Sequence, residues 1–284
     1  ASAKTSGHYD WISEEAQGII ARGYNRHHAL LDRSDKYPPA LSEEQLRNLV
    51  GPFHYPPKDT IDSMAFYAMR FLRRFVHMFF RDNYLHHSVC LETVAAVPGI
   101  CAAAHRHMRS LRNMKRDHGW INPLQEEAEN ERMHLLIWMQ MAKPSILERA
   151  LVVFAQASYT AFYTGLYLLS PRGAHRLVGY LEEEAFAAYT SFIESIDQGK
   201  IANAPAPEIA IQYYRLPPDA RLSDVVLQVR CDESLHGAFN HMLADKYRSK
   251  DTDSAPAFMG ADLRGAEATD NDVPVDPSRE PTPK

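Results

Sequence analysis

The stretches "NERMHLL" (residues 130–136) and "DESLH" (residues 232–236) contain the same arrangement, a glutamate three positions before a histidine. The pairs are Glu131 with His134 and Glu233 with His236, and both lie inside long segments of helical periodicity. Residues three apart share a helix face, so each pair projects a carboxylate and an imidazole into the same space. One pair alone is commonly a solvated acid beside a core histidine. Two pairs on two helices indicate a common site that needs further partners.

Long helices account for most of the chain. Apolar residues recur at spacings of three and four over six segments, which we predict as helices at residues 60–81, 83–112, 122–142, 145–169, 171–197 and 222–248. Pro123, Pro144 and Pro171 lie at their boundaries. The sequence has no Gly-rich phosphate loop, Cys-x-x-Cys pair or Gly-x-Ser-x-Gly motif, so side chains on these helices must carry the chemistry.

The two ends differ in composition from this helical body. Residues 1–58 hold five prolines among polar residues and are expected to form an irregular arm with short helical pieces. Residues 250–284 have few large apolar side chains and repeated prolines, and are expected to be disordered. The predicted organisation is therefore an arm (1–58), a helical bundle domain (59–249) and a tail (250–284).

The composition argues against two classes of protein. A formal net charge of −5 does not suit a chain that mainly neutralises phosphates, so nucleic acid is not an expected partner. The three cysteines, Cys90, Cys101 and Cys231, are too few for a disulfide framework, and each is expected to be a small buried thiol on a helix. The hydrophobic content of 45% over 284 residues is enough for a sizeable core.

Two further glutamates lie on apolar helix faces. In "LETVAAVPG" Glu92 is the only acid, and burying an unpaired carboxylate costs several kcal/mol, so we expect a metal ion or an arginine beside it. In "GYLEEEAFAAY" three consecutive acids must point in directions about 100° apart. Glu182 shares the apolar face and is expected to point inward, whereas Glu183 is expected to be solvated and Glu184 to lie at an edge.

These groups follow one another along the chain as Glu, Glu-x-x-His, Glu, Glu-x-x-His. This is the ligand set of a ferritin-like four-helix bundle with a carboxylate-bridged pair of metal ions. We therefore predict an all-α fold of that type, with metal ligands at Glu92, Glu131, His134, Glu182, Glu233 and His236. Four carboxylates neutralise most of the charge of two ions, and two imidazoles leave open positions for dioxygen. Iron is favoured over manganese by its usual redox role. The alternative is a bundle in which acids recur without binding metal.

Several neighbours of these residues suit a supporting role. Asn130 and Asp232 each precede a motif glutamate, and His175 shares the face of Glu182, so all three are expected to hold ligand side chains in place. Tyr189 lies two turns from Glu182 on the same face and is expected to supply an electron or a proton when the O–O bond is cleaved. The alternative for Tyr189 is a buried tyrosine whose hydroxyl is hydrogen-bonded.

Two predicted helices have the composition of membrane-contacting segments. Residues 61–81 combine large apolar side chains with four arginines, as in a basic amphipathic helix on an anionic surface. Residues 150–169 hold no charged side chain but include three tyrosines, which fits burial in one leaflet better than a span. We expect the helices at 60–81 and 145–169 to contact one membrane leaflet. A dimer interface or plain core is the alternative.

Together these features resemble the alternative oxidases, the cyanide-insensitive ubiquinol oxidases of mitochondria. The matching stretches, between about residues 80 and 245, are "LETVAAVPG", "RDHGWIN", "EEAENERMHLL", "HRLVGYLEEEA", "PEIAIQYYRLP" and "RCDESLH" followed by "FNH". The resemblance implies a homodimeric, monotopic protein on the matrix side of the mitochondrial inner membrane. It also implies two iron ions bridged by Glu131 and Glu233, an essential Tyr189, and reduction of dioxygen to water by ubiquinol without proton pumping.

The departures from the family pattern lie away from the predicted metal ligands. Four positions differ from residues that members often carry: His77 for Asp, His87 for Arg, Ala188 for Thr and Tyr214 for Trp. The resemblance implies a quinol pocket at Arg73, His87, Leu91, Glu184, Ala185 and Ala188. Leu91, Glu184 and Ala185 match the family at this pocket, so the oxygen chemistry is better supported than the affinity for quinol.

The sequence thus favours a membrane-associated di-iron quinol oxidase. One alternative is a di-iron hydroxylase of a lipid or quinone precursor, which would insert oxygen into its product. The other is an inactive membrane-bound helical bundle, which would bind no pair of irons.

Overall fold

The structure is a computed structural model that describes residues 9–31, 41–49, 54–80 and 84–256. Within these ranges the chain forms nine α-helices and no β-strand, which confirms the all-α prediction. The helices are α1 (Glu14–Leu31), α2 (Glu43–Arg47), α3 (Thr60–Phe80), α4 (Tyr84–Asn113), α5 (Ile121–Ala142), α6 (Ile146–Leu169), α7 (Pro171–Asp197), α8 (Glu208–Tyr214) and α9 (Leu222–Arg248). The six helices predicted from periodicity agree with α3, α4, α5, α6, α7 and α9 to within one residue at each end.

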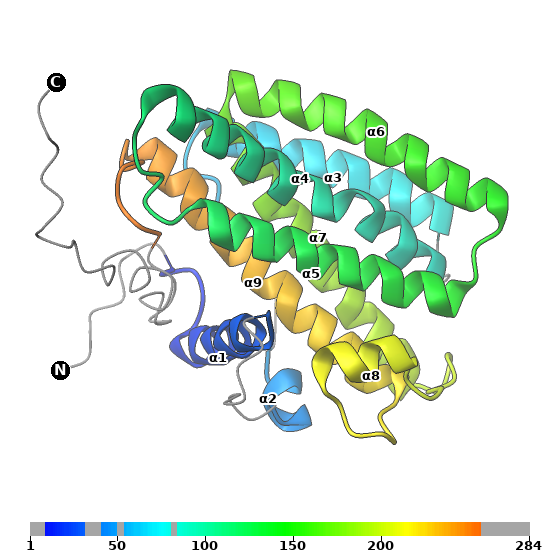
Figure 1. Cartoon of the computed structure of the whole chain (residues 1–284). Helices are drawn as coiled ribbons and strands as arrows, with labels where there is room; N and C mark the ends of the chain where they lie inside the picture. Colours follow the sequence, from blue (N-terminus) through cyan, green and yellow to red (C-terminus); the bar gives the residue numbers. More distant parts are fainter. Residues whose placement is uncertain (1–8, 32–40, 50–53, 81–83, 257–284) are drawn as a thin grey trace, which may run out of the picture.

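Four helices, α4, α5, α7 and α9, form the central bundle (Figure 1). Helix α4 packs along α5, and α7 packs along α9. Helix α6 connects the two pairs and runs parallel to α4, because His86 meets Glu148 in the first turns of both helices and Cys101 meets Thr164 further along. This is the four-helix bundle with one long crossover that the ligand order predicts.

Glycines allow close approach within each helix pair. A Cβ atom on Gly99 of α4 would lie 2.5 Å from the Leu124 carbonyl oxygen of α5. A Cβ atom on Gly179 of α7 would lie 2.5 Å from the His241 ring of α9. Because neither position tolerates a side chain, the backbones of α4 and α5 lie close together, and the His241 ring of α9 packs directly on the backbone of α7.

Local sequence determines where α6 and α7 begin. Ser145 caps α6, since its hydroxyl accepts a hydrogen bond from the Glu148 amide at 3.3 Å and the Glu148 carboxylate accepts one from the Ser145 amide at 2.7 Å. Pro171 occupies the first turn of α7, where a missing amide hydrogen costs nothing. The connection between α6 and α7 is therefore a single residue, and the two helices are antiparallel neighbours.

Helix α4 contains the centre of the core. It is the one helix in the described ranges that is long and apolar enough to cross a membrane, and 72% of that apolar stretch is buried inside the protein, as in a core helix. Cys101 on α4 and Cys231 on α9 are buried, as predicted. The prediction for Cys90 was wrong: this thiol is exposed, because its neighbours Val89 and Glu92 occupy the inner face of α4.

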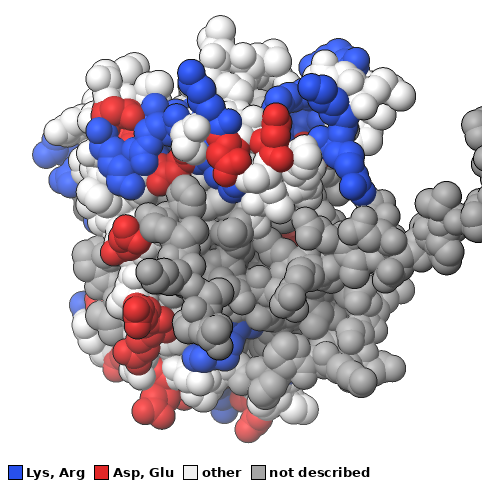
Figure 2. Space-filling model, turned by 90° about the vertical axis from the view of Figure 1, so that its left-hand side faces the viewer, with Lys and Arg blue, Asp and Glu red and all other residues white. Residues whose placement is uncertain are grey.

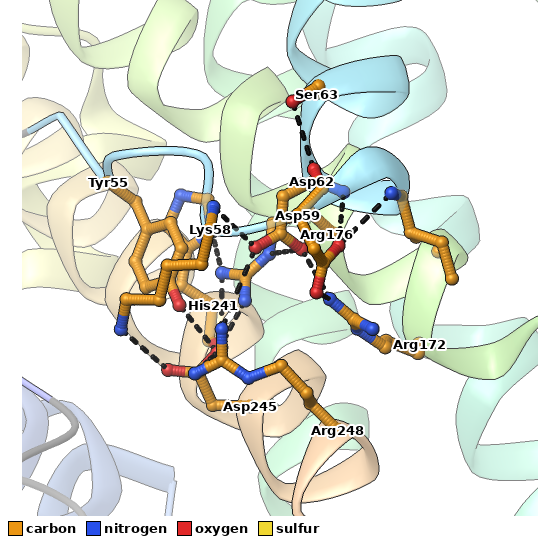
Figure 3. A network of polar contacts seen from close by, with 12 residues as sticks. Tyr55, Lys58, Asp59, Asp62, Ser63, Arg172, Arg176, His241, Asp245 and Arg248 are labelled. Atoms are coloured by element: carbon orange, nitrogen blue, oxygen red, sulfur yellow. Dashed lines mark hydrogen bonds and ion pairs between the residues drawn. The ribbon is translucent and has the colours of Figure 1, made fainter.

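A buried ionic network joins the N-terminus of α3 to α7 and α9 (Figure 3). The fully buried Arg176 of α7 donates from Nε to Asp62 of α3 at 2.9 Å and from Nη2 to Asp245 of α9 at 2.5 Å. Arg172 donates to Asp62 at 3.0 Å, and the guanidinium of Arg176 lies 3.7 Å from the centre of the Tyr55 ring. These contacts fix α3 on the outside of the bundle.

The N-terminal arm has more structure than its prolines suggest. Helix α1 has 18 residues and packs against α9, and its Ile19 and Ile20 belong to the main core. Within the arm, Tyr55 is also buried and donates a hydrogen bond to Asp245 at 2.6 Å. Of the predicted disordered tail, residues 257–284 lie outside the described part of the chain, so that prediction is untested.

Candidate metal centre

The two Glu-x-x-His pairs and the two single glutamates converge in the middle of the bundle. Helix α4 supplies Glu92, α5 supplies Glu131 and His134, α7 supplies Glu182, and α9 supplies Glu233 and His236. None of the six side chains is more than 3% exposed. The chain therefore places four carboxyl groups and two imidazoles in a space without solvent.

These six residues form two overlapping groups, each suited to one metal ion. The first consists of Glu92, Glu131, His134 and Glu233, and the second of Glu131, Glu182, Glu233 and His236. Within each group one potential ligand atom per residue lies within 4.8 Å of all the others. Glu131 and Glu233 belong to both groups, as expected of carboxylates that bridge two ions.

Hydrogen bonding supports a cation site at this place. His236 Nδ1 lies 2.5 Å from Glu131 Oε1 and His134 Nδ1 lies 3.2 Å from Glu233 Oε1, but these contacts lack hydrogen-bond geometry. Among the described residues, both carboxylate oxygens of Glu131 and of Glu233 are therefore buried without a hydrogen-bond partner. The same is true of four further atoms, one on each of the remaining residues: Glu92 Oε2, Glu182 Oε1, His134 Nδ1 and His236 Nδ1. Buried polar atoms without partners are rare in proteins and destabilising. Here they gather as eight potential ligand atoms, so the donor set fits two cations.

The pKa shifts of the glutamates also favour a cation site. Burial raises the pKa of Glu92 and Glu182 well above the usual range, and the nearby carboxylates of Glu131 and Glu233 raise both values further. Burial acts in the same direction on Glu131, but the imidazoles of His236 and His134 outweigh it, so the pKa of Glu131 lies well below its usual value. Cations at this site would relieve the repulsion among the carboxylates.

A polar group on α9 contacts His134 through the ring nitrogen that does not face the glutamates. His134 Nε2 lies 3.2 Å from Asp232 Oδ2, while its Nδ1 faces the glutamates. The same Asp232 oxygen accepts hydrogen bonds from Asn130 Nδ2 at 3.0 Å and from the Tyr214 hydroxyl at 2.9 Å. Tyr214 thus contributes a hydroxyl to the group that orients His134.

On the other side of the centre, the structure reveals a residue that the sequence did not single out. Glu127 of α5 is buried, and burial raises its pKa to about 7. Its Oε1 accepts a hydrogen bond from Asn240 Nδ2 at 2.9 Å, and Asn240 Oδ1 lies 2.9 Å from His175 Nδ1. His175 therefore contacts Asn240 rather than a predicted ligand. No neighbour of Glu127 in the sequence marks it as buried, because its partner Asn240 lies on α9.

Tyr189 lies beside the centre on α7. Its hydroxyl donates a hydrogen bond to Glu92 Oε1, and its ring stacks on Trp138 with ring centres 5.7 Å apart. Burial raises the pKa of Tyr189 well above the usual range, and the carboxylates of Glu92 and Glu233 raise it further. Tyr189 is therefore a neutral phenol with its proton directed at one of the four carboxyl groups.

The residues expected to form a quinol pocket lie where α3, α4 and α7 meet. Arg73 of α3 forms an ion pair with Glu184 of α7 at 2.9 Å, and Leu91 of α4 packs against the small cluster between α3 and α7. Ala185 and His87 are buried, and Ala188 is half-buried. The side chain of His77 lies outside the described part of the structure.

The expectation that Glu183 is solvated was wrong. Its carboxylate accepts a hydrogen bond from the Tyr55 amide at 2.7 Å and lies 2.9 Å from His241 Nε2 and 2.8 Å from His54 Nδ1. The N-terminal arm and α9 cover this position, and the sequence of α7 alone contains no sign of that cover.

A four-helix bundle with one crossover and two overlapping Glu/His groups defines a class of carboxylate-rich helical metal proteins. A comparison with protein families identifies the particular one, because residues 41–245 match the model of the alternative oxidase family. The match covers well over half of the chain, and the chain therefore belongs to the alternative oxidase family.

Named relatives agree with this assignment. The chain is 47% identical over 224 residues to the mitochondrial ubiquinol oxidase of Batrachochytrium dendrobatidis, with 78% of the chain and 71% of that protein covered. It is 47% identical over 208 residues to mitochondrial alternative oxidase 3 of Glycine max and over 209 residues to mitochondrial ubiquinol oxidase 1a of Arabidopsis thaliana. These two matches cover 73% of the chain but only 64% and 59% of the plant proteins.

Proposed function

We propose that this chain is a quinol:oxygen oxidoreductase that oxidises ubiquinol and reduces dioxygen to water. The net reaction converts two quinols and one dioxygen into two quinones and two waters, so the protons and electrons balance without proton pumping. The observation that carries the proposal is the pair of overlapping buried groups that share Glu131 and Glu233. Membership of the alternative oxidase family and the names of the relatives support the same reaction.

Two iron ions are the proposed metals. Glu92 and His134 would hold one ion, Glu182 and His236 would hold the other, and Glu131 and Glu233 would bridge them. When bound, a pair of irons would pass the electrons of quinol to dioxygen and would offer the open coordination positions that dioxygen reduction needs. Asp232 has a separate task, since it fixes His134 in the orientation in which Nδ1 faces the glutamates.

Tyr189 is the proposed redox-active or proton-donating residue. Its phenol donates to Glu92 Oε1, and Trp138 covers its ring. A buried phenol with a strongly raised pKa keeps its proton until a strong base or an electron loss releases it. This position allows Tyr189 to deliver a proton to a group at the centre.

The ion pair of Arg73 with Glu184 is the proposed entrance for quinol. Leu91 and Ala185 contribute apolar surface at the junction of α3, α4 and α7, and Arg73 and Glu184 contribute polar groups for a quinol hydroxyl. Leu91 directly precedes Glu92 on α4, and Ala185 lies three residues after Glu182 on the same face of α7, so a quinol against these side chains would lie close to the centre. His87 and Ala188 complete the proposed pocket.

Helices α3 and α6 are the proposed membrane contacts. Both carry large exposed apolar side chains, including Met64, Tyr67 and Phe71 on α3 and Leu147, Phe154 and Leu169 on α6. Soluble proteins rarely expose so many large apolar residues on two helices. We propose a homodimeric, monotopic protein on the matrix side of the mitochondrial inner membrane, in line with the mitochondrial relatives.

The test is oxygen uptake by the purified chain with iron and a soluble quinol analogue, in the presence of cyanide. Quinol-dependent uptake that persists in millimolar cyanide is the expected result. Uptake that micromolar cyanide abolishes would contradict the proposal. With labelled dioxygen, a hydroxylase would place the label in its organic product, whereas an oxidase places it in water. An inactive bundle would retain neither iron nor activity.

A further inference from the structure

The segment from His105 to Gly119, "HRHMRSLRNMKRDHG", is net positive, whereas the whole chain is net negative. The whole protein has 36 acidic residues against 31 Lys and Arg. This segment, which joins α4 to α5, holds four arginines and one lysine but a single acid, Asp117. In Figure 2, which faces the end of the bundle, Lys and Arg side chains gather along the upper part of the surface, with a few Asp and Glu side chains among them. The local charge therefore favours an anionic partner.

This segment lines a cavity. Its volume is about 550 Å³, and it is lined by Arg106, Arg109, Lys115, Arg116 and His118, together with the short segment that follows α9. We call it the corner cavity. Sites for small molecules usually measure about 300–1,000 Å³, so the corner cavity has room for one.

Two aspartates line the corner cavity, and each lies beside one of its arginines. Asp117 accepts hydrogen bonds from Arg106 Nε at 2.7 Å and from the amides of Trp120 and Ile121 at 3.1 and 2.9 Å. The highly exposed Asp253 comes no closer than 3.9 Å to Arg109. Among the described residues, the lining of the cavity thus holds four Lys and Arg side chains against two aspartates.

The walls of the corner cavity are fixed in place. The guanidinium of Arg106 is 3% exposed and stacks over the Trp120 ring at 3.9 Å. Trp120 Nε1 donates to the Ser254 carbonyl at 2.9 Å, and Lys246 Nζ donates to Asp251 at 2.8 Å, which holds the segment after α9 against the loop. A preformed wall reduces the entropy that a ligand must overcome on binding.

The loop between α4 and α5 adopts an unfavourable backbone conformation. Met114 and His118 have φ angles of 49° and 60°, in the left-handed region that residues other than glycine rarely adopt. Such conformations persist where the surrounding structure enforces them, and they concentrate at binding sites. Here they turn the chain so that Lys115 and Arg116 stand beside Arg109.

We propose that the corner cavity binds the phosphate group of an anionic ligand. Arginine forks match phosphate oxygens and form two parallel charge-assisted hydrogen bonds, and lysine adds a point charge. An anionic phospholipid and a soluble phosphate ester both present this group. The site lies outside the metal centre and does not depend on the proposed oxidase reaction.

The experiment compares two double variants of the full chain in detergent. R109Q/K115Q removes two cations from the cavity, and R22Q/K200Q removes two exposed cations from α1 and from the turn after α7. Titration calorimetry measures inorganic phosphate and glycerol 3-phosphate, and flotation measures vesicles of phosphatidylcholine with and without phosphatidylglycerol. Because two charge-assisted contacts are lost, we expect R109Q/K115Q to weaken binding at least about tenfold, with R22Q/K200Q near the parent protein.

The source of the phosphate follows from the probe that responds. A weakened affinity for glycerol 3-phosphate assigns the site to a soluble ester. A loss confined to phosphatidylglycerol vesicles assigns it to a lipid. If the parent protein binds none of these probes, or if the two double variants bind them equally, the proposal is wrong.

Discussion

At the scale of single residues, Glu131 and Glu233 differ from every other acid described in the chain. They alone have both carboxylate oxygens buried without a hydrogen-bond partner among the described residues. A carboxylate that bridges two cations uses both oxygens, so the proposed bridging role accounts for this property.

Replacing Glu131 with Ala should therefore remove metal as well as activity. We expect the parent protein to hold about two irons per chain and the variant to hold fewer than one, because both ligand groups lose a member. Iron analysis after reconstitution measures this directly. Glu129→Ala, on the outer face of the same helix, is the matched control and should keep its iron. Normal iron content in Glu131→Ala would contradict the ligand assignment.

Tyr189→Phe tests the role of the phenol. The variant keeps the ring that stacks on Trp138 and loses only the hydroxyl that donates to Glu92. Since positioned proton transfer contributes roughly 10²–10⁴ to a rate, we expect kcat to fall at least about a hundredfold while the iron content is unchanged. Tyr163→Phe removes a buried hydroxyl without a partner among the described residues, and should leave kcat unaltered. Equal rates in both variants would leave Tyr189 as a structural residue.

His175 predicts a pH dependence of stability. Burial lowers its pKa from 6.5 to about 4 in the folded protein, so unfolding takes up a proton between these pH values. The contribution of His175 is fully present above about pH 6.5 and is lost as the pH falls. For a fully buried group this amounts to about 2 kcal/mol less stability at pH 5 than at pH 7. Denaturant unfolding of the metal-free protein at both pH values should show a smaller decrease for His175→Gln. Equal decreases in the parent protein and in His175→Gln would contradict the lowered pKa of His175.

The sequence pattern identified the six inward-pointing ligand candidates but not the acids around them. Glu92 and Glu182 were found because each lies on an otherwise apolar helix face. Glu127 and Glu183 were missed because their surroundings come from distant segments: Asn240 on α9 for the first, and Tyr55, His54 and His241 for the second. Helical periodicity predicts the direction in which a side chain points. It does not predict which other segment of the chain covers that side chain.

At the scale of helices, the buried network at Arg176 determines how α3 sits on the bundle. Asp62 and Asp245 are at most 2% exposed and both depend on Arg176. Arg176→Leu would leave two buried carboxylates with reduced compensation, so we expect a loss of about 3–5 kcal/mol in the free energy of unfolding.

A surface pair provides the comparison for this loss. Arg47 pairs with Asp197 at 2.7 Å, but both side chains are more than a third exposed. Arg47→Leu should cost less than about 1 kcal/mol in the same denaturant titration, because water screens the pair. Similar losses in Arg47→Leu and Arg176→Leu would mean that the buried network contributes no more to the free energy of unfolding than the exposed pair.

Helix bounds and the four helices of the central bundle were predictable, whereas the attachment of α3 was not. Each of the six long helices has a continuous apolar face and a proline or polar break near its end, and these signals are local. Helix α8 has only seven residues, which is too short for a periodic signal. The pairing of Asp62 with Arg176 spans more than a hundred positions, so no local pattern contains it.

At the scale of the whole molecule, the outer surfaces of α3 and α6 are the feature that calls for contact with a phase other than water. Each of these helices already packs an inner face against the bundle, because Tyr163 and Tyr167 of α6 belong to the main core and Ala65 and Met69 of α3 to the smaller cluster beside it. The apolar outer faces of α3 and α6 therefore remain as surface that another phase must cover, and we propose that this phase is a lipid leaflet.

Phe71→Ser tests this proposal. Phe71 of α3 is 66% exposed, and burying such a side chain in an apolar environment contributes roughly 1.5–3 kcal/mol. We therefore expect the variant to bind neutral phosphatidylcholine vesicles about tenfold more weakly in a flotation assay. Leu136→Ser, on α5, is the control, because Leu136 is 36% exposed on a helix that is not proposed to touch lipid. If Phe71→Ser floats as well as the parent protein, or if Leu136→Ser weakens flotation as much as Phe71→Ser, the proposed contact of α3 with the leaflet is wrong.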